Sequence, residues 1–326
     1  MRRLRIGLIG AARIAPHGII GPVAAEPRAK LVAIAARDGA RARDFAAEHG
    51  IPRWSAGYAD LLADPDIDLV YIATPPTNHA ALAIAALDAG KHVLVEKPFS
   101  MTAAEARTVL DVARTQGRSV VEAMHAIHHP LFRRVADLVA TGAVGTVRRL
   151  RARFDITLTN PDDFRWQGKL GGGALMDLGV YPLAMVRRLA GEDFAVATAK
   201  PVIRDDTDEA FSARLIFAGG PVADVSASLA APAGADLIVE GDAGTITVTN
   251  PIVPHRGNKL RVETEAGVQE EEVGGPTSWT AQLHALCDTL LDGAPFALPD
   301  DDFVHSMVAI DKVRAAGGWP PLEPGT

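Results

Sequence analysis

The sequence predicts an α/β fold in which a doubly wound parallel sheet precedes an α+β domain with a large, mostly antiparallel open sheet. Short apolar runs alternate with Ala-rich stretches up to about residue 124, which is the pattern of strand–helix–strand units. Later runs alternate polar and apolar residues, as half-exposed strands do. The chain of 326 residues is too long for one ordinary domain. We therefore expect two domains, residues 1–124 and 125–326.

The composition narrows the range of functions. The net charge is −7 and both signs are scattered along the chain, which argues against nucleic acid or an anionic membrane as the main partner. Cys287 is the only cysteine, so no internal disulfide can form and we expect a reducing, cytoplasmic compartment. No run of about 18 apolar residues occurs, so we expect no transmembrane helix.

The N-terminus has one feature of a secretory signal, because basic residues precede an apolar run in MRRLRIGLIG. However, Gly7 and Gly10 interrupt the run, Arg13 follows almost at once, and no suitable cleavage site comes later. We interpret the stretch Leu4–Gly10 as the first strand of the sheet.

The first half contains five candidate strands. Each is a short apolar run of the kind that parallel sheets bury on both faces. Ala-rich stretches between them predict helices, and glycines follow where helix C-caps are expected. The candidate strands are Leu4–Gly10, Lys30–Arg37, Leu69–Thr74, His92–Pro98 and Ser119–Met124, and the helices are Gly39–Gly50, Asn78–Gly90 and Thr102–Gly117.

The second half predicts a run of antiparallel strands. Turn signals such as Gly219-Gly220 and Gly241-Asp242 separate its alternating segments. An open sheet of this kind needs cover on its free face. The candidate strands lie in 146–159, 209–218, 222–230, 236–250 and 259–273, and two helices are expected near 280–291 and 300–315.

The first strand leads into a reduced form of the dinucleotide fingerprint Gly-x-Gly-x-x-Gly. Only the first glycine remains, and alanine fills the other two positions. Small residues still let the backbone approach a pyrophosphate, and the segment opens a strand–helix–strand unit. We expect it to bind the cofactor through Gly10, Ala11, Ala12, Arg13 and Ile14.

The second strand ends in Arg37-Asp38. An NAD site normally has a carboxylate at this strand end for the ribose 2′-hydroxyl. A guanidinium fits the 2′-phosphate of NADP instead, through bidentate charge-assisted hydrogen bonds. With Arg41 as a second positive charge, we favour NADP. The alternative is that Arg37 is a solvated charge and Asp38 binds the hydroxyl of NAD.

Three further motifs follow in a characteristic order: TPPTNH after the third strand, EKP after the fourth, and GGGALMDLGVYPL from Gly171 to Leu183. With these motifs the chain resembles the glucose-fructose oxidoreductase / inositol dehydrogenase / rhizopine-catabolism (Gfo/Idh/MocA) family of NAD(P)-dependent oxidoreductases. Many family members carry histidine at the position of Tyr181. The tyrosine form resembles the subgroup that includes glucose-fructose oxidoreductase, dimeric dihydrodiol dehydrogenase and some xylose dehydrogenases. The resemblance implies a Rossmann domain, a substrate-binding domain, and a homodimer or homotetramer formed through the open sheet.

The resemblance places the loop after the third strand, with Thr74, Pro75, Asn78 and His79, along the ribose and nicotinamide of the cofactor. Two alternatives stay open there. Asn78 can cap the helix that follows. His79 can instead be a solvent-facing residue at the helix N-terminus.

Lys97 lies at the carboxyl end of the fourth strand, where ligands bind in open α/β sheets. The resemblance makes Lys97 a catalytic-site residue that contacts the substrate and the nicotinamide ribose. It implies that Glu96 orients the lysine or contacts the ribose, and that Pro98 forms a cis peptide.

Asp177 and Tyr181 are four residues apart in a segment that reads as helix from about Leu175, so they share a face. Hydride transfer to a carbonyl leaves an alkoxide that must receive a proton. A nearby ammonium favours ionisation of a phenol. We therefore expect Tyr181 to act as general acid/base with Lys97 as its electrostatic partner, and Asp177 to hold a substrate hydroxyl or position Lys97. The alternative is a core tyrosine held by Asp177.

Other residues are candidates for the substrate pocket. Trp166 offers an apolar face for a sugar ring, and core packing is the alternative. His125 is expected to line the pocket rather than to bind metal with His129, because Pro130 follows and no Glu or Cys completes a ligand set. We expect no metal. Arg165 is a further candidate, with Phe154 and Asp155 as weaker ones.

The residues and the resemblance together predict an NADP-dependent oxidoreductase that acts on a secondary alcohol or carbonyl of a sugar or cyclic polyol. One alternative is a nucleotide-linked keto-sugar reductase, for which Arg133, Arg134, Arg165 and Arg187 are the arginines available to a pyrophosphate. Another is a non-catalytic cofactor sensor, because fold does not fix function.

Overall fold

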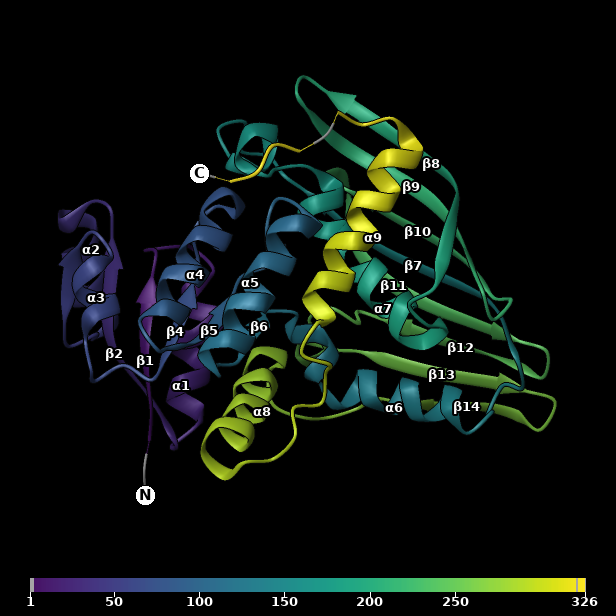
Figure 1. Cartoon of the computed structure of the whole chain (residues 1–326). Coiled ribbons are helices and arrows are strands. Elements are labelled where there is room, and N and C mark those ends of the chain that lie inside the picture. The colour runs from purple at the N-terminus through teal and green to yellow at the C-terminus, as the bar shows by residue number, and fades with distance from the viewer. Residues whose placement is uncertain (1–2, 321, 326) are drawn as a thin grey trace. The chain divides into compact units, whose positions relative to one another are not determined.

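A computed structural model describes residues 3–320 and 322–325 of the chain. They form two compact units (Figure 1). The first contains the described residues up to Ala123, then Trp279–Met307 and the described residues from Pro324 on. The second contains Met124–Ser278 and Val308–Glu323. The first unit thus takes in a late stretch of the chain, which the single boundary expected between residues 124 and 125 does not describe.

The first unit is built on a six-stranded parallel sheet with the order β3-β2-β1-β4-β5-β6. This order is that of the doubly wound nucleotide-binding fold, and it confirms the predicted fold class. All four residues of β4 are buried, as strands covered on both faces require. The strands are β1 (Leu4–Ile9), β2 (Ala29–Ala36), β3 (Trp54–Ala56), β4 (Leu69–Ile72), β5 (His92–Val95) and β6 (Val120–Glu122).

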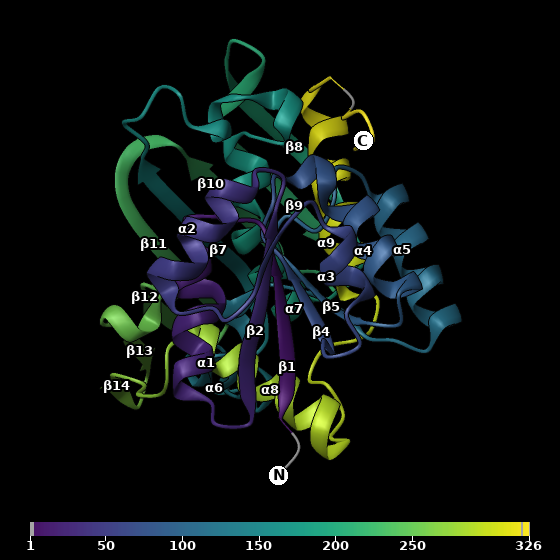
Figure 2. The same ribbon diagram turned by 90° about the vertical axis from the view of Figure 1, so that its left-hand side faces the viewer.

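Helices cover both faces of this sheet. Figure 2 shows α1 and α2 on one side and α4 and α5 on the other. Gly50 and Gly117 follow α2 and α5 in the left-handed conformation, which confirms the predicted C-caps. Thr102 and Glu105 form a capping box at the start of α5. The helices are α1 (Gly21–Ala25), α2 (Gly39–His49), α3 (Ala59–Ala63), α4 (His79–Asp88), α5 (Ala103–Gln116) and α8 (Ser278–Asp292).

The second unit is built on an eight-stranded sheet with the order β14-β13-β12-β11-β7-β10-β9-β8. Only the β7–β10 pair is parallel, so the predicted, mostly antiparallel sheet is confirmed. The strands are β7 (Val147–Thr157), β8 (Phe194–Arg204), β9 (Thr207–Phe217), β10 (Val222–Ser228), β11 (Ala230–Gly241), β12 (Gly244–Thr249), β13 (Lys259–Thr264) and β14 (Gly267–Glu271).

The two faces of this sheet differ in polarity. Leu150 and Ala152 of β7 are buried on the face that α7 covers. Arg149, Arg151 and Arg153 point to the other face, because side chains alternate along a strand, and they pair with acidic residues of β10 and β11. Helices α6 (Pro130–Ala140) and α7 (Val180–Ala190) lie in this unit, and α9 (Asp302–Gly317) continues into it.

Two strands were not expected from the sequence. The strand β3 has only three residues, and its Trp54 is exposed. The strand β8 is an edge strand in which most residues are exposed and Pro201 interrupts the pattern. Neither therefore has the apolar signature of a strand. Within the described part of the chain, we find no helix whose length and apolar character would let it cross a membrane.

Candidate active site

The turn after β1 fits the close approach of a dinucleotide backbone. Gly10 has a φ of 103°, in the left-handed region, and a Cβ there would lie 2.5 Å from the carbonyl oxygen of Ala73. Only glycine can occupy this position. Ala12 and Ala15, which replace the other fingerprint glycines, keep the turn small, and Ala15 is fully buried. The residues present therefore fit a bound nicotinamide dinucleotide.

The charged side chains at and just after the end of β2 differ in whether they have partners within the protein. The Asp38 carboxylate caps α2 by accepting hydrogen bonds from the N–H groups of Ala40, at 2.8 Å, and Arg41, at 3.3 Å. The Arg41 guanidinium donates to the carbonyl oxygen of Ala11 at 2.8 Å. The Arg37 side chain is exposed, and we find no ion pair to it among the described residues. Asp38 is thus occupied, whereas Arg37 is available to an anionic ligand.

His79 joins two loops of the predicted cofactor site. Its Nδ1 atom lies 2.9 Å from the carbonyl oxygen of Pro98, and its Nε2 atom lies 2.8 Å from that of Thr74. The ring is buried, so the alternative of a solvent-facing His79 is wrong. Burial lowers the pKa of His79 to about 4 despite the hydrogen bonds to these carbonyls. A neutral imidazole carries a single N–H, so at neutral pH His79 donates a hydrogen bond to one of these carbonyl oxygens and only contacts the other.

The prediction that Asn78 caps the following helix is only partly confirmed. Asn78 occupies the N-cap position of α4, but its side chain makes no capping hydrogen bond. The loop before it begins at Thr74 and Pro75, directly after β4 and Ala73. The strand therefore ends two residues earlier than expected, and the side-chain amide of Asn78 makes no capping hydrogen bond that would keep it from a ligand.

Lys97 follows β5 and is half-buried, and the Lys97–Pro98 peptide bond is cis, as predicted. The neighbouring Glu96 is buried. Its Oε1 atom accepts a hydrogen bond from the Tyr71 hydroxyl at 2.5 Å, and its Oε2 atom accepts one from the Lys97 N–H at 3.2 Å. Glu96 thus fixes the backbone from which Lys97 projects. The contribution of Tyr71 was not expected from the sequence.

In the second unit, Asp177 and Tyr181 lie on a helical segment that begins with a π-helical turn, Leu175–Gly179, and continues as α7. Such turns occur often at functional sites. Asp177 is buried and accepts a hydrogen bond from Arg165 Nε at 2.7 Å. Burial opposes the charge on Arg165, but Asp177 and Asp163 raise its pKa overall. The sequence placed Asp177 and Arg165 in one pocket, and the structure joins them as an ion pair.

The Tyr181 hydroxyl lies 2.9 Å from Nε2 of His125. The Nδ1 atom of His125 lies 2.9 Å from Oγ of Ser278. All three residues are buried. The Phe154 ring meets the tyrosine edge-on, with 5.6 Å between ring centroids. His125 and Phe154 therefore belong to the surroundings of Tyr181, whereas Asp155 pairs with Arg153 at 2.6 Å.

The indole of Trp166 is already engaged. The Arg204 guanidinium lies over its ring, 4.2 Å from the centroid, and the indole N–H donates to the carbonyl oxygen of Asn160 at 3.1 Å. One face of the ring is therefore taken by a cation–π contact. A sugar ring could therefore stack only on the opposite face of the Trp166 indole.

Asp208 is a residue of this region that the sequence analysis missed. It is 1% exposed, and its carboxylate accepts a hydrogen bond from the Leu175 N–H at 2.7 Å, at the start of the segment that carries Asp177. Gly173, which enters the segment with a φ of 113°, has no room for a Cβ because Asp208 Oδ1 would lie 2.3 Å away. Burial raises the pKa of Asp208 to about 6.

The histidine cluster at His125–His129 has structural partners. His129 Nδ1 accepts a hydrogen bond from the Leu131 N–H at 3.1 Å and so caps α6. His128 is buried, which lowers its pKa to about 3. Among the residues that the structure describes, no group of three or more His, Cys, Asp or Glu side chains is arranged to hold a metal ion.

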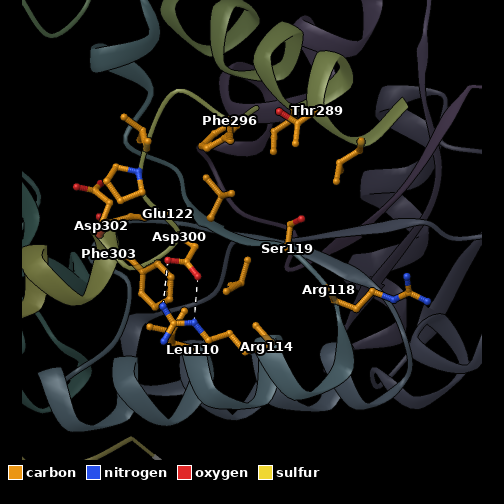
Figure 3. A pocket seen from close by; sticks show the side chains of 17 residues that line it. Leu110, Arg114, Arg118, Ser119, Glu122, Thr289, Phe296, Asp300, Asp302 and Phe303 are labelled. Carbon is orange, nitrogen blue, oxygen red and sulfur yellow. Dashed lines mark hydrogen bonds and ion pairs between the residues drawn. The ribbon is translucent and has the colours of Figure 1, made fainter. Parts of the chain in front are cut away.

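A separate cavity of about 320 Å³ lies within the first unit (Figure 3). Its walls come from α5, β6, α8 and the segment 296–303. Apolar side chains such as Leu110, Phe296 and Phe303 line it, and the ion pair between Arg114 and Asp300 lies beside them. None of the predicted catalytic or cofactor-binding residues lines this cavity.

Comparison with known proteins agrees with this geometry. Residues 4–124 match the model of an oxidoreductase family with an NAD-binding Rossmann fold, and residues 132–247 match the GFO/IDH/MocA C-terminal domain. The chain belongs to the GFO/IDH/MocA family of oxidoreductases, which makes it an enzyme of the dehydrogenase and reductase class.

Particular relatives can be named. The chain is 38% identical over 302 residues to a dTDP-3,4-didehydro-2,6-dideoxy-alpha-D-glucose 3-reductase of Streptomyces violaceoruber, covering 89% of this chain and 86% of the relative. It is 32% identical over 315 residues to D-xylose 1-dehydrogenase (NADP(+)) 2 of Haloferax volcanii, covering 95% and 96%. The structure of KijD10, a 3-ketoreductase from Actinomadura kijaniata in complex with NADP and TDP-benzene, is similar with a TM-score of 0.90 at 28% identity, covering 97% of this chain and 98% of KijD10.

Proposed function

We propose that this protein is an NADP(H)-dependent oxidoreductase that interconverts a secondary alcohol and a carbonyl on a sugar or cyclic polyol. The observation that carries the proposal is the buried Tyr181 hydroxyl, which is engaged by a histidine and lies four residues from a buried, ion-paired carboxylate. A phenol so placed can give or take the proton that carbonyl–alcohol chemistry requires. The chain's family supplies the nicotinamide-binding fold.

NADP is the cofactor that the charges at the end of β2 favour. Asp38 is committed to capping α2, and Arg37 offers an exposed guanidinium to a 2′-phosphate. The xylose dehydrogenase relative is named for NADP(+), and KijD10 was solved with NADP. We propose that residues Gly10–Ile14 and Thr74–His79, together with Glu96 and Lys97, contact the rest of the cofactor.

The proposed mechanism assigns one task to each side chain. When bound, the nicotinamide supplies or accepts the hydride. Tyr181 gives its proton to the oxygen of the reduced carbonyl, or takes it from the alcohol in the reverse direction. The Lys97 ammonium is expected to favour the phenolate form of Tyr181. Asp177, held by Arg165, accepts a hydrogen bond from a neighbouring substrate hydroxyl.

A nucleotide-linked keto-sugar is the second candidate substrate, and the 38% identity to a dTDP-sugar 3-reductase favours it. Three of the four arginines considered for its pyrophosphate are engaged: Arg134 pairs with Glu271, Arg165 with Asp177, and Arg187 with Glu192. Arg133 is exposed, and among the described residues no ion pair to it is found. Of these four arginines, Arg133 is therefore the one that this alternative would assign to the pyrophosphate.

We further propose that residues 1–124 bind the dinucleotide, and that residues 125–326 bind the substrate and join copies of the chain through the open face of the eight-stranded sheet. That face has exposed apolar side chains, Val202 and Ile216, beside the ion pairs of Arg149 and Arg214 with Asp224. Such a mixture of apolar area and charge is typical of protein interfaces.

The proposal is tested by Tyr181→Phe, with Tyr58→Phe, at a half-buried tyrosine of the first unit, as the matched control. Turnover should be screened with aldoses, inositols, cyclic diols and dTDP-linked keto-sugars. We expect Tyr181→Phe to lower kcat by about 10²- to 10⁴-fold while the Kd for NADPH, measured by fluorescence, stays within about twofold. Unchanged turnover would remove Tyr181 from the mechanism. NADPH binding without turnover of any compound would favour a cofactor sensor.

A further inference from the structure

Tyr181 is the end of a buried chain of three protic side chains. Its hydroxyl lies 2.9 Å from His125 Nε2, and His125 Nδ1 lies 2.9 Å from Ser278 Oγ. The exposed fractions are 4% for Tyr181, 3% for His125 and 0% for Ser278. Both nitrogens of the imidazole thus face hydroxyl groups, which can donate or accept a proton.

We propose that His125 is the proton partner of Tyr181: it exchanges a proton with the phenol through Nε2, and Ser278 fixes the ring for this exchange. The inference rests on the proposed role of Tyr181 as the acid/base. His125 acts through Tyr181 and does not itself contact the substrate. Its role is to position the Tyr181 hydroxyl and to set its protonation state.

The proton transfer balances in both directions. For alcohol oxidation, the phenol O–H bond breaks and an N–H bond forms at Nε2, which leaves a phenolate beside an imidazolium whose Nδ1–H donates to Ser278 Oγ. The phenolate then takes the proton of the substrate hydroxyl as hydride leaves the carbon atom. For carbonyl reduction, the phenol protonates the new alkoxide oxygen and regains a proton from Nε2. Water supplies or removes the net proton at the imidazole.

The geometry distinguishes His125 from two other buried histidines, His79 and His129. Both ring nitrogens of His79 face backbone carbonyl oxygens, which can only accept a hydrogen bond. The Nδ1 atom of His129 accepts from a backbone N–H at the start of α6. These contacts fix a ring in place but do not carry a proton onward. His125 alone among these three lies between two hydroxyl groups.

The surroundings of the pair support an ionised phenol. The Phe154 ring meets Tyr181 edge-on and limits its rotation. Two charged groups of the second unit lie near the pair: Arg165, which interacts electrostatically with Tyr181, and Asp177, which pairs with Arg165. The Asp177 carboxylate partly offsets the charge of Arg165, so we expect the proton partner at Nε2 to act on the ionisation of the phenol together with the ammonium of Lys97.

The experiment measures ionisation of Tyr181 in the cofactor-free protein. The chain has three tyrosines, so subtracting the ultraviolet titration of Tyr181→Phe isolates the signal of Tyr181. We expect His125→Gln, which keeps a hydrogen-bonding group but cannot carry a proton, to raise the midpoint of phenolate formation by about one pH unit or more. His128→Gln changes a buried neighbour and should leave the midpoint in place.

Kinetics give a second readout. We expect His125→Gln to lower kcat/KM by about 10²-fold and to shift the acid limb of its pH profile in parallel with the phenol midpoint, whereas His128→Gln keeps the wild-type profile. Ser278→Ala should shift the phenolate midpoint and the acid limb in the same direction but by less. If His125→Gln does not fold, Ser278→Ala replaces it in the test. In ¹⁵N spectra of the wild type, the His125 ring should change protonation together with the tyrosine, and Tyr181→Phe should abolish this coupling.

The outcomes separate this inference from the proposed function. A His125→Gln protein with an unchanged phenol midpoint and pH profile overturns the role of His125 even if Tyr181→Phe is inactive. A Tyr181→Phe protein that keeps full turnover overturns the proposed function itself. Equal shifts in His125→Gln and His128→Gln would mean that both act by disturbing the fold, and would also overturn the role of His125.

Discussion

The Arg165 guanidinium donates a hydrogen bond from Nε to the buried Asp177 carboxylate at 2.7 Å. Removing Asp177 takes away the closer of the two carboxylates that pair with the half-buried Arg165 and leaves Asp163 at 3.4 Å. We expect Asp177→Ala to lower the free energy of unfolding by about 1–3 kcal/mol and to lower kcat/KM about tenfold or more. Thermal unfolding and initial-rate kinetics measure the two effects. Asp162→Ala removes an exposed carboxylate from the loop before Arg165 and should change neither quantity, so equal effects of the two variants would contradict a role for Asp177.

The exposed Arg37 guanidinium at the end of β2 is expected to decide between NADP and NAD. We expect Arg37→Ala to weaken NADP binding by about 10- to 100-fold, because a charge-assisted contact to the 2′-phosphate is lost. NAD affinity should stay within about twofold. Fluorescence titration with both cofactors measures this. Arg43→Ala, on the exposed surface of α2 where Arg43 pairs with Asp44, is the control. Equal losses for NADP and NAD would sink the 2′-phosphate assignment.

His79 predicts a loss of stability in acid. Its pKa is lowered to about 4 in the folded state, below its ordinary value near 6.5. Between these values the unfolded chain binds more protons, so the stability from His79 is present above about pH 6.5 and is lost as the pH falls toward 4. The loss is on the order of 3 kcal/mol. Chemical unfolding of the wild type and of His79→Gln at pH 5 and 7 should show a steeper acid loss in the wild type. Parallel losses would contradict a buried, neutral His79.

The open face of the eight-stranded sheet predicts self-association. Ile216 is 47% exposed on β9, and Arg214 on the same face pairs with Asp224. We expect Ile216→Glu to shift the sedimentation of the protein toward the monomer, because a charge would be buried in the interface without a partner. Trp54→Glu alters an equally exposed apolar residue of the first unit and should leave sedimentation unchanged. A wild-type protein that sediments as a monomer would refute this assembly.

Local patterns were sufficient for much of the fold. Short apolar runs predicted five of the six strands of the parallel sheet, because strands such as β4 are buried on both faces. Gly10 was found from its position alone, and its φ of 103° explains why it is glycine. The edge strands β3 and β8 were missed because they bury little, so the sequence leaves no apolar signature there.

Partners that are distant in sequence could not be predicted. Ser278 lies 153 residues from His125, and Asp208 lies 33 residues from Leu175. No local periodicity relates such pairs, since only the folded chain brings them together. The sequence did predict that Asp177, Arg165 and His125 belong near Tyr181, but not that Arg165 would pair with Asp177 or His125 with Tyr181. His79 shows the same limit, because its burial depends on a loop 19 residues away.

Asp208 predicts a pH dependence of opposite sign to that of His79. Its pKa is raised to about 6 by burial, above its ordinary value near 3.9. The folded state therefore holds the proton more tightly, so the stability linked to Asp208 is present below about pH 4 and is lost as the pH rises through 6. The loss is on the order of 3 kcal/mol. Asp208→Asn keeps an oxygen that can accept the Leu175 N–H but cannot ionise.

As the pH rises from 4 to 6, we therefore expect the free energy of unfolding to fall in the wild type more than in Asp208→Asn. Chemical unfolding across that range measures this difference. Asp206→Asn, in the exposed turn before β9, is the matched control and should follow the wild type. Asp208→Ala removes the acceptor as well, so it should also loosen the segment that carries Asp177 and raise KM. An Asp208→Asn protein whose stability tracks the wild type at every pH would show that Asp208 ionises in the folded state as it does in water.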